Sequence, residues 1–293
     1  MSKHSVLVTG AGGNLGGKLI ATLGAATWCS RIIAVDRPAA LEAAGFEPSH
    51  KIERRPINLV AASAQAHADA VTGADAIVHF AVTNPLPDAT WEEAADSFAM
   101  TARLLMQARD LRVRRFVFAS SNHAVGRLKE ESDSLAPGSL GVDRVAPGTR
   151  WETLDGFMVG QAYGASKVFS ERMCLAAAQP DGLSTLAIRI GWYQAGENHP
   201  ETLNAGGNPQ ISERGAQSRS DKHALTWFRN MWLSNRDFAA LFERAILAES
   251  VPWPQPGIVI NGVSANSGMP WEIESARRLI GYVPQDDVWT FLS

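Results

Sequence analysis

The chain is poor in cysteine and has no long apolar run. Only two cysteines, Cys29 and Cys174, occur in 293 residues. Two cysteines are too few for a disulfide framework, so a reducing compartment is expected. No segment reaches the roughly 18 uninterrupted apolar residues that a membrane span needs, and no apolar signal core follows Met1. We therefore expect a cytoplasmic protein that has no membrane partner.

The chain also lacks an excess of charge of either sign. The 27 lysines and arginines and the 30 aspartates and glutamates leave a formal net charge of −3. This near balance gives no electrostatic reason to expect nucleic acid as a partner. The seven histidines have no spacing typical of metal ligands, so no metal site is expected. The remaining composition, 45% hydrophobic and 19% charged, is that of an ordinary soluble globular protein.

Short β-branched runs alternate with longer helical patterns over the first two thirds of the chain. Strands are expected at residues 5–9, 31–35, 51–57, 76–81, 115–120 and 183–189, and helices at residues 14–23 and before residue 108. Alternation of this kind is typical of a parallel sheet covered by helices on both faces. The predicted fold class is therefore α/β, a doubly wound parallel sheet of the Rossmann type.

Two segments, residues 126–161 and 195–222, are predicted to form long loops. The second is rich in Gly, Asn, Pro, Ser and charged residues and has almost no apolar period. Long loops inside a compact domain are usually functional or mobile. Both loops are therefore expected to border a substrate pocket.

Regular patterns return after the second loop. Helices are expected at residues 236–248 and 271–280, and a short strand at residues 258–260. This part is too small and broken to bury a core of its own. We therefore expect residues 1–190 to form a nucleotide-binding domain and residues 191–293 to form a small C-terminal substrate cap. The last elements of this cap return to the core, so it is not an independent domain.

A glycine-rich run lies between the first expected strand and the first expected helix, at residues 9–16. Gly10 permits a tight turn, Gly13 lets the backbone approach a pyrophosphate, and Gly16 lets the helix pack closely on the strand. The helix N-terminus then presents free N–H groups and the positive end of its dipole to phosphates. The predicted cofactor contacts in this run are Gly10, Gly13, Asn14, Leu15 and Gly16.

An acidic residue, Asp36, closes the second expected strand about 20 residues after the last glycine. A carboxylate at this place can accept hydrogen bonds from both ribose hydroxyls of NAD and would repel the 2′-phosphate of NADP. Arg37 follows directly and can pair with such a phosphate, so NADP stays an alternative. The acidic residue favours NAD as the cofactor.

A tyrosine and a lysine open another predicted helix. Tyr163 and Lys167 are four residues apart and therefore lie on the same helical face. The lysine ammonium, together with the positive nicotinamide ring of a bound cofactor, favours phenolate and should lower the pKa of the tyrosine. A tyrosine of this kind can take a proton from an alcohol or return it to a carbonyl oxygen.

Three polar residues, Ser121, Asn122 and His123, follow the fifth expected strand. In an open α/β sheet, ligands bind at the carboxyl ends of the strands. A serine hydroxyl at this place can hydrogen-bond the substrate oxygen. The glycine run, the acid and these groups occur in the order that a hydride-transferring enzyme requires.

Together these features resemble the extended short-chain dehydrogenase/reductase family, also called the NAD-dependent epimerases/dehydratases. The resemblance covers most of the chain and rests on the glycine run, Asp36, Ser121, Tyr163 and Lys167. It implies that Ser121, Tyr163 and Lys167 form a catalytic triad. It also implies that a hydride moves between a substrate carbon and nicotinamide C4, while Tyr163 handles the proton.

The same resemblance implies further contacts and an assembly. It places Asn58, Leu59 and Ala81 at the cofactor, together with Tyr163 and Lys167, and Asn58 replaces the usual aspartate near the adenine. A homodimer built from the tyrosine-bearing helix and its neighbour is also implied.

Within the family, residues 118–123, 188–191, 232–238 and 264–266 are similar to segments of uronate dehydrogenases. In such enzymes an asparagine and a histidine contact sugar hydroxyls, and an arginine holds the carboxylate. Carried onto this chain, the substrate residues are Ser121, Asn122, His123 and Arg189. A bidentate guanidinium–carboxylate pair gives Arg189 a physical role, and bracing of loops is its alternative.

The expected function is therefore oxidation of a hydroxyl-bearing carbon with NAD, for example of a sugar acid (a uronate) to its lactone. A sugar epimerase that retains its NAD uses the same triad and stays an alternative, and a non-enzymatic NAD(H) sensor is a third. Nine tryptophans are many for this length, and five lie in the substrate-side half: Trp151, Trp192, Trp227, Trp232 and Trp271. Because indoles stack on rings, they favour a substrate bulkier or more aromatic than a bare uronate.

Overall fold

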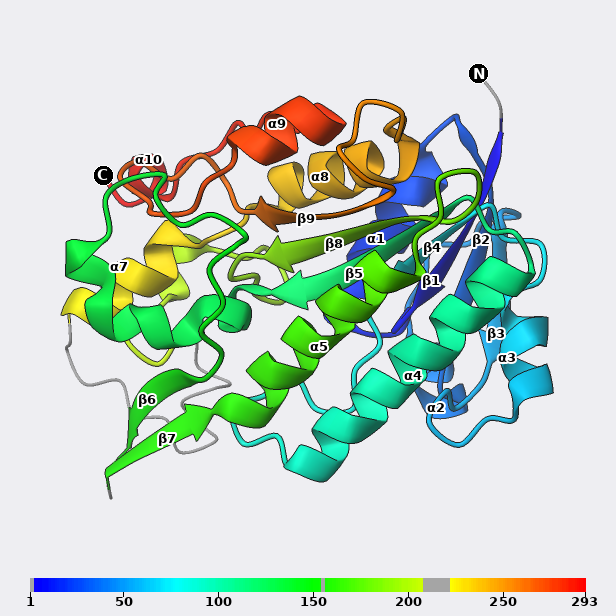
Figure 1. Ribbon diagram of the computed structural model, residues 1–293, viewed down its shortest axis with the longest axis horizontal. Coiled ribbons are helices and arrows are strands. Elements are labelled where there is room, and N and C mark those ends of the chain that lie inside the picture. The colour runs from blue at the N-terminus through cyan, green and yellow to red at the C-terminus, as the bar shows by residue number, and fades with distance from the viewer. Residues whose placement is uncertain (1–2, 154–155, 208–221) are drawn as a thin grey trace.

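The computed structural model describes residues 3–153, 156–207 and 222–293. Its centre is a parallel sheet of seven strands in the order β3-β2-β1-β4-β5-β8-β9 (Figure 1). The strands of this sheet are β1 His4–Thr9, β2 Cys29–Asp36, β3 Ile52–Pro56, β4 Ala76–His79, β5 Arg115–Ser121, β8 Ser184–Ile190 and β9 Gly257–Gly262. This arrangement confirms the predicted Rossmann-type α/β fold.

Helices cover both faces of the sheet (Figure 1). One face carries α3 Ala64–Val71, α4 Trp91–Asp110 and α5 Gln161–Ala177, and the other carries α1 Asn14–Ala25, α2 Pro38–Ala43, α8 Asn235–Leu247 and α9 Glu274–Ile280. Side chains of a strand alternate between the faces. Accordingly, Val6 and Val8 of β1 pack with α1 and α8, whereas Leu7 packs with α4. Every β1 residue from Val6 to Thr9 is therefore buried, as expected for a strand covered on both sides.

The structure corrects the prediction of a long loop at residues 126–161. A 3₁₀ segment, η1 Asn122–Ser134, follows β5, and an antiparallel hairpin of β6 Thr149–Thr153 and β7 Gly156–Gly160 leads directly into α5. The cross-strand pairs run from Thr149 opposite Gly160 to Thr153 opposite Gly156. A hairpin of two short strands is marginally stable by itself and depends on what it packs against. Its own sequence therefore contains few signals that predict it.

The predicted loop at residues 195–222 is described in part, since residues 208–221 lie outside the described residues. A 3₁₀ turn, η2 Pro200–Thr202, lies in the described part, and α7 Lys222–Asn230 begins at its end. The chain closes with the short helix α10 Val288–Phe291. Neither α7 nor α10 was expected from the sequence pattern.

The C-terminal part of the chain contributes to the main sheet and core. Strand β9 pairs in parallel with β8 as the last strand of the sheet. Phe238 and Leu241 of α8 belong to the same buried cluster as Val6 and Val8 of β1. Among the described residues, no helix combines the length and apolarity needed to span a membrane.

Candidate active site

The turn between β1 and α1 has the shape of a phosphate cradle. Gly10 has a φ of +67°, which favours glycine, and an added Cβ there would lie 2.9 Å from the backbone N of Ala81. A Cβ on Gly16 would overlap the carbonyl oxygen of Gly10. No side chain caps α1 at Gly13, so its first-turn N–H groups are available to an anion.

The carboxylate of Asp36 lies beside this turn. Its Oδ2 accepts a hydrogen bond from N of Gly12 at 3.0 Å and its Oδ1 accepts one from N of Arg37 at 2.8 Å. The adjoining cavity, of about 240 Å³, is lined by Asp36, Arg37, Ile57, Asn58, Leu59, Val60, Ala81, Val82, Thr83, Asp96 and Met100. A slot that combines apolar side chains with polar ones, among them the carboxylate of Asp36, fits the adenosine half of NAD. The cradle and the slot together therefore fit the predicted cofactor.

The three predicted catalytic residues come together at the carboxyl end of β5. Ser121 ends that strand, and its hydroxyl lies near enough to the phenol of Tyr163 to act on the pKa of the tyrosine. Lys167, one turn further along α5, has its Nζ 5.5 Å from the centroid of the tyrosine ring. The same Nζ donates to the carbonyl oxygen of Ala119 at 2.7 Å. The spacing in sequence thus produces one cluster in space.

Burial controls the protonation of this cluster. Desolvation raises the pKa of Tyr163 to about 12, against a smaller lowering effect of its hydrogen bond to Ser121. The expected lowering of this pKa includes the positive ring of a bound cofactor and therefore stays a prediction. Desolvation also lowers the pKa of Lys167 to about 8, although the charges of Glu171 and Cys174 act to raise it.

The predicted substrate residues Asn122 and His123 border the same cluster. Nδ2 of Asn122 donates to the carbonyl oxygen of Ile190 at 3.1 Å. The ring of His123 lies 5.6 Å from that of Tyr163, and its Nδ1 is 2.5 Å from Oγ1 of Thr149 in the hairpin. Burial lowers the pKa of His123 to about 4, so its imidazole is neutral near neutral pH.

The hairpin carries Trp151 to this point. Residues alternate along β6, so Thr149 and Trp151 are buried while Arg150 and Glu152 form an ion pair outside. The indole of Trp151 lies 5.4 Å from the ring of His123. A Cβ on Gly160 would come within 2.9 Å of Cζ3 of Trp151, so this glycine makes room for the indole.

A cavity of about 220 Å³ lies among these groups. Its described lining combines the triad with aromatic and proline side chains: Leu15, Phe80, Val82, Pro85, Leu86, Pro87, Ala119, Ser120, Ser121, Asn122, His123, Trp151, Tyr163, Lys167, Ile190, Gly191, Trp192 and Tyr193. Leu15 belongs to the phosphate cradle, and Val82 also lines the adenosine slot. The cavity therefore adjoins the cofactor site and is the candidate substrate pocket.

Arg189 does not line this cavity, which corrects the predicted carboxylate-binding role. Its guanidinium donates from Nε to Oε1 of Glu171 at 2.8 Å and from Nη2 to Oε2 at 2.9 Å. Its Nη1 donates to the carbonyl oxygen of Arg144 at 2.8 Å. Arg189 and Glu171 are each 1% exposed. A substrate carboxylate would have to displace Glu171, so the guanidinium braces β8 against α5.

Of the five tryptophans expected near the substrate, Trp151 and Trp192 line the pocket. Trp227, Trp232 and Trp271 do not line it, although all five belong to one buried apolar cluster. Thr149, Phe80, Pro85, Pro87 and Tyr193 were not expected at the site. No spacing rule identifies them, because packing alone brings Thr149 to His123 and the other four to the pocket.

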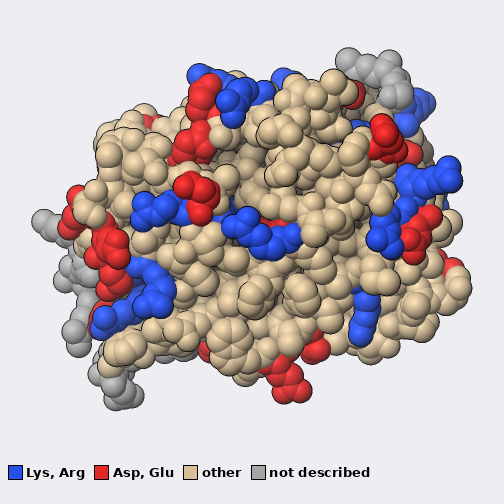
Figure 2. Space-filling model, in the orientation of Figure 1, with Lys and Arg blue, Asp and Glu red and all other residues tan. Residues whose placement is uncertain are grey.

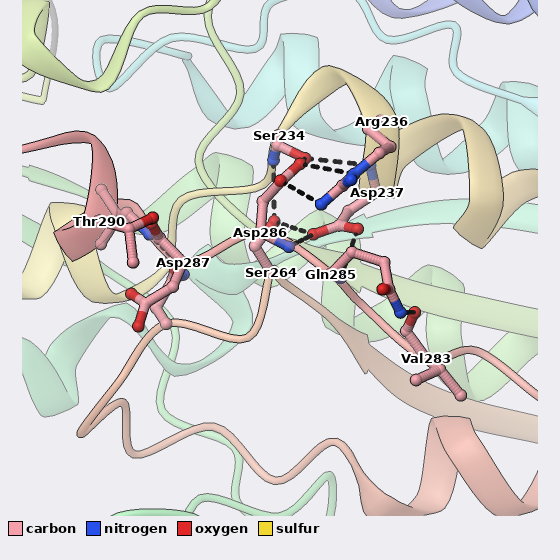
Figure 3. A network of polar contacts seen from close by, with 11 residues as sticks. Ser234, Arg236, Asp237, Ser264, Val283, Gln285, Asp286, Asp287 and Thr290 are labelled. Atoms are coloured by element: carbon pink, nitrogen blue, oxygen red, sulfur yellow. Dashed lines mark hydrogen bonds and ion pairs between the residues drawn. The ribbon is translucent and has the colours of Figure 1, made fainter.

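The segments at residues 232–238 and 264–266 form a structural network (Figure 3). Asp237, which is fully buried, accepts hydrogen bonds from Oγ of Ser264 at 2.6 Å, N of Gln285 at 2.8 Å and N of Asp286 at 3.0 Å. Oγ of Ser234 donates to Oδ2 of Asp286 at 2.5 Å. These bonds hold the C-terminal segment against the start of α8, so the role of this network is structural.

A second buried network lies behind the lysine. Nδ1 of His79 is 2.7 Å from Oγ1 of Thr9, and its Nε2 is 3.0 Å from Oγ1 of Thr101. Burial, with a smaller effect of the charge of Lys167, lowers the pKa of His79 to about 3. Ser97 joins this region through its Oγ, which accepts from N of Thr83 at 3.0 Å.

Comparison with known proteins places this site in a family. The model of the NAD dependent epimerase/dehydratase family matches residues 6–238. The chain belongs to that family. It is 30% identical over 220 residues to L-arabinose 1-dehydrogenase (NAD(P)(+)) of Haloferax volcanii, covering 75% of this chain and 77% of that protein. It is 30% identical over 223 residues to the NAD-dependent glucose-6-phosphate dehydrogenase of the same organism, covering 75% and 71%.

Solved structures of the family share the fold. The glucuronic acid dehydrogenase of Chromohalobacter salexigens superimposes with a TM-score of 0.69 at 24% identity, over 99% of this chain and 87% of that one. Uronate dehydrogenases also occur among the sequence relatives, at 27% identity. The predictions of family, of NAD as cofactor and of an NAD-dependent dehydrogenase are thereby confirmed.

Proposed function

We propose that the protein oxidises a hydroxyl-bearing ring carbon of a sugar-type substrate, with Tyr163 as the general acid/base. The observation that carries this proposal is the grouping of Ser121, Tyr163 and Lys167 in the wall of a cavity that adjoins the cofactor cradle. The relatives named as arabinose and glucose-6-phosphate dehydrogenases support a sugar-type substrate.

The roles of the residues follow from their positions. Ser121 Oγ is placed to hydrogen-bond the substrate oxygen next to the phenol of Tyr163, which takes the hydroxyl proton. When bound, NAD⁺ supplies the hydride acceptor and a positive ring that offsets the desolvation of the phenolate. Because burial lowers the pKa of Lys167 to about 8, its Nζ can pass the proton onward near neutral pH. Oxidation of a ring hemiacetal carbon in this way yields a lactone.

The direct test is production of NADH from NAD⁺ with L-arabinose, glucose 6-phosphate and glucuronate. Tyr163→Phe should lower kcat by a factor of about 10² to 10⁴, the usual contribution of a general acid/base, without changing the affinity for NADH. Fluorescence titration with NADH provides that control. Net NADH would exclude a sensor, whereas interconversion of sugar epimers without net NADH would identify the alternative epimerase.

We also propose that the protein is a homodimer through α4 and α5. Their outer face carries Trp91, Phe98, Met106 and Phe169, which are 61%, 37%, 54% and 58% exposed. Figure 2 has few charged side chains over the middle of these two helices. Exposed apolar patches of this kind mark interaction sites. A mass by light scattering that falls from dimer to monomer in Phe169→Glu would support this assembly, and a monomeric wild type would refute it.

A further inference from the structure

The candidate substrate pocket contains buried polar atoms that no described residue satisfies. Oδ1 of Asn122, Nε1 of both Trp151 and Trp192, and the hydroxyl of Tyr193 have no hydrogen-bond partner among the described residues. Asn122, Trp151 and Trp192 are 3%, 3% and 7% exposed, and all four residues line the pocket. Because buried polar groups in native proteins are nearly always paired, four unpaired groups around one cavity indicate a ligand that completes them.

The kind of partner follows from the chemistry of each group. Nδ2 of Asn122 is held by the carbonyl oxygen of Ile190, which orients the amide so that Oδ1 is an acceptor and requires a donor. Indole Nε1 is a donor only, so Trp151 and Trp192 require an acceptor. An ionised carboxylate or phosphate accepts but does not donate. The phenol of Tyr193 can donate or accept, and so can a sugar hydroxyl, so several hydroxyls on one ring can serve all four groups.

The charge of the pocket wall agrees with an uncharged ligand. The ring of His123 is tied through Nδ1 to Thr149 and is neutral near neutral pH, because burial lowers its pKa to about 4. Lys167 is the single lysine or arginine in the described lining, and its Nζ is bound to the carbonyl oxygen of Ala119. The guanidinium of Arg189 is occupied by Glu171.

The shape of the wall provides a stacking surface. The indoles of Trp151 and Trp192 lie 5.4 Å and 5.8 Å from the ring of His123, so three aromatic rings adjoin one another beside Tyr163. The apolar face of a sugar ring can pack on an indole while its hydroxyls reach the edge donors. A purely aromatic alcohol would fill the same space but leave Asn122 and the indole N–H groups unpaired.

We propose that the pocket selects an uncharged polyhydroxylated ring, a neutral aldose in its pyranose form, and that Trp151 and Trp192 are specificity-determining residues. The inference rests on the proposed dehydrogenase activity and narrows its substrate class. Such a substrate differs from a uronate or a sugar phosphate by carrying no charge, and the β6–β7 hairpin carries Trp151 into the pocket that would select it.

Sugars that differ at a single carbon test whether the pocket prefers neutral over anionic substrates. Glucose, glucuronate and glucose 6-phosphate differ only at carbon 6, as do galactose and galacturonate, and L-arabinose lacks that carbon. We expect kcat/KM with NAD⁺ for the best neutral sugar to exceed that for every anionic sugar by at least about tenfold, the effect of one hydrogen bond. Equal or better turnover of an anionic sugar, or of benzyl alcohol, would overturn the inference and leave the dehydrogenase proposal standing.

A binding measurement separates the two proposals if no sugar yields NADH. That result would contradict the dehydrogenase activity alone. Tryptophan fluorescence of the NADH-bound enzyme would then be titrated with the same sugars. Tighter binding of the neutral member of each set would support the pocket assignment, and equal or tighter binding of the anionic member would refute it.

Single substitutions test the two indoles. Trp151→Phe and Trp192→Phe keep an aromatic ring but remove the N–H, and each should lower kcat/KM for the neutral sugar about tenfold through KM, with unchanged NADH affinity and pH profile. Trp227→Phe is the matched control, because its Nε1 is also buried and unpaired but it does not line the pocket. Unchanged KM in both pocket variants, or an equal loss in Trp227→Phe, would refute their role.

Discussion

Arg189 of β8 and Glu171 of α5 form a bidentate ion pair in the interior, with both N–O distances below 3.0 Å and both side chains 1% exposed. Oγ of Ser120 donates a third hydrogen bond to Oε1 of Glu171 at 2.5 Å. Glu171 also acts to raise the pKa of Lys167 on the same helix. The pair therefore ties the end of β8 at the candidate active site to the helix that carries Tyr163 and Lys167, the residues for which we propose catalytic roles.

Removal of the arginine should reduce stability rather than substrate binding. Arg189→Met leaves a buried, uncompensated carboxylate, and we expect the free energy of unfolding to fall by roughly 3–5 kcal/mol. The double variant Arg189→Met with Glu171→Leu should recover most of that loss. Urea denaturation measures both. A variant of normal stability with a greatly raised KM would instead restore the carboxylate-binding role.

The choice between NAD and NADP should depend on Asp36. Its carboxylate edges the adenosine slot, where ribose hydroxyls are expected to donate to it. Asp36→Ala should weaken NAD⁺ binding by about ten- to a hundredfold, the effect of charge-assisted hydrogen bonds, and should improve NADP⁺ relative to NAD⁺. Calorimetric titration of both cofactors checks this.

The neighbouring Arg37 serves as the control for that experiment, because it lines the same slot. Arg37→Ala should leave NAD⁺ affinity unchanged and weaken NADP⁺. Equal NAD⁺ affinity in wild type and Asp36→Ala would contradict the assignment.

Mild acid should destabilise the fold through two buried histidines. Burial lowers the pKa of His79 to about 3 and that of His123 to about 4, from an ordinary value of 6.5. Between these values and about pH 6.5 the unfolded chain binds protons that the native state excludes, so stability falls as the pH falls through this window. Below the lowered values both states are protonated, and this contribution no longer changes.

Thermal melting as a function of pH tests this dependence. His123→Gln removes one of the two groups, so its Tm should fall less than that of the wild type between about pH 6.5 and about pH 4. His50→Gln is a suitable control, because that histidine is exposed. Parallel Tm curves for the wild type and His123→Gln would show that the ring is not held neutral.

The carboxylate network of the C-terminal segment should be a major source of stability. Asp237→Asn keeps the size of the side chain but turns one oxygen into a donor that faces the N–H of Gln285 or Asp286. We expect a loss of roughly 2–3 kcal/mol, the cost of unsatisfied buried groups. Arg236→Ala breaks an ion pair whose arginine is 61% exposed and should cost at most about 1 kcal/mol. Chemical denaturation distinguishes the two, and equal losses would contradict this ranking.

Local chemistry made the cofactor site predictable from the sequence. A glycine at a positive φ, a helix start without a side-chain cap and an acid at the end of the next strand are short-range features. The pairing of Tyr163 with Lys167 follows from helical spacing alone. The order of strands and helices likewise follows from residues close together in the chain, which is why most of the sheet was predicted.

Tertiary packing decided the substrate side of the protein. The sequence indicates an arginine near the end of β8. Only the fold brings Glu171 to Arg189 and so keeps the guanidinium out of the pocket. Only the fold carries Trp151 on a hairpin to His123, and only the fold buries the phenol of Tyr163, which raises its pKa. These properties depend on desolvation and on contacts between residues far apart in the chain, and neither quantity is contained in local spacing.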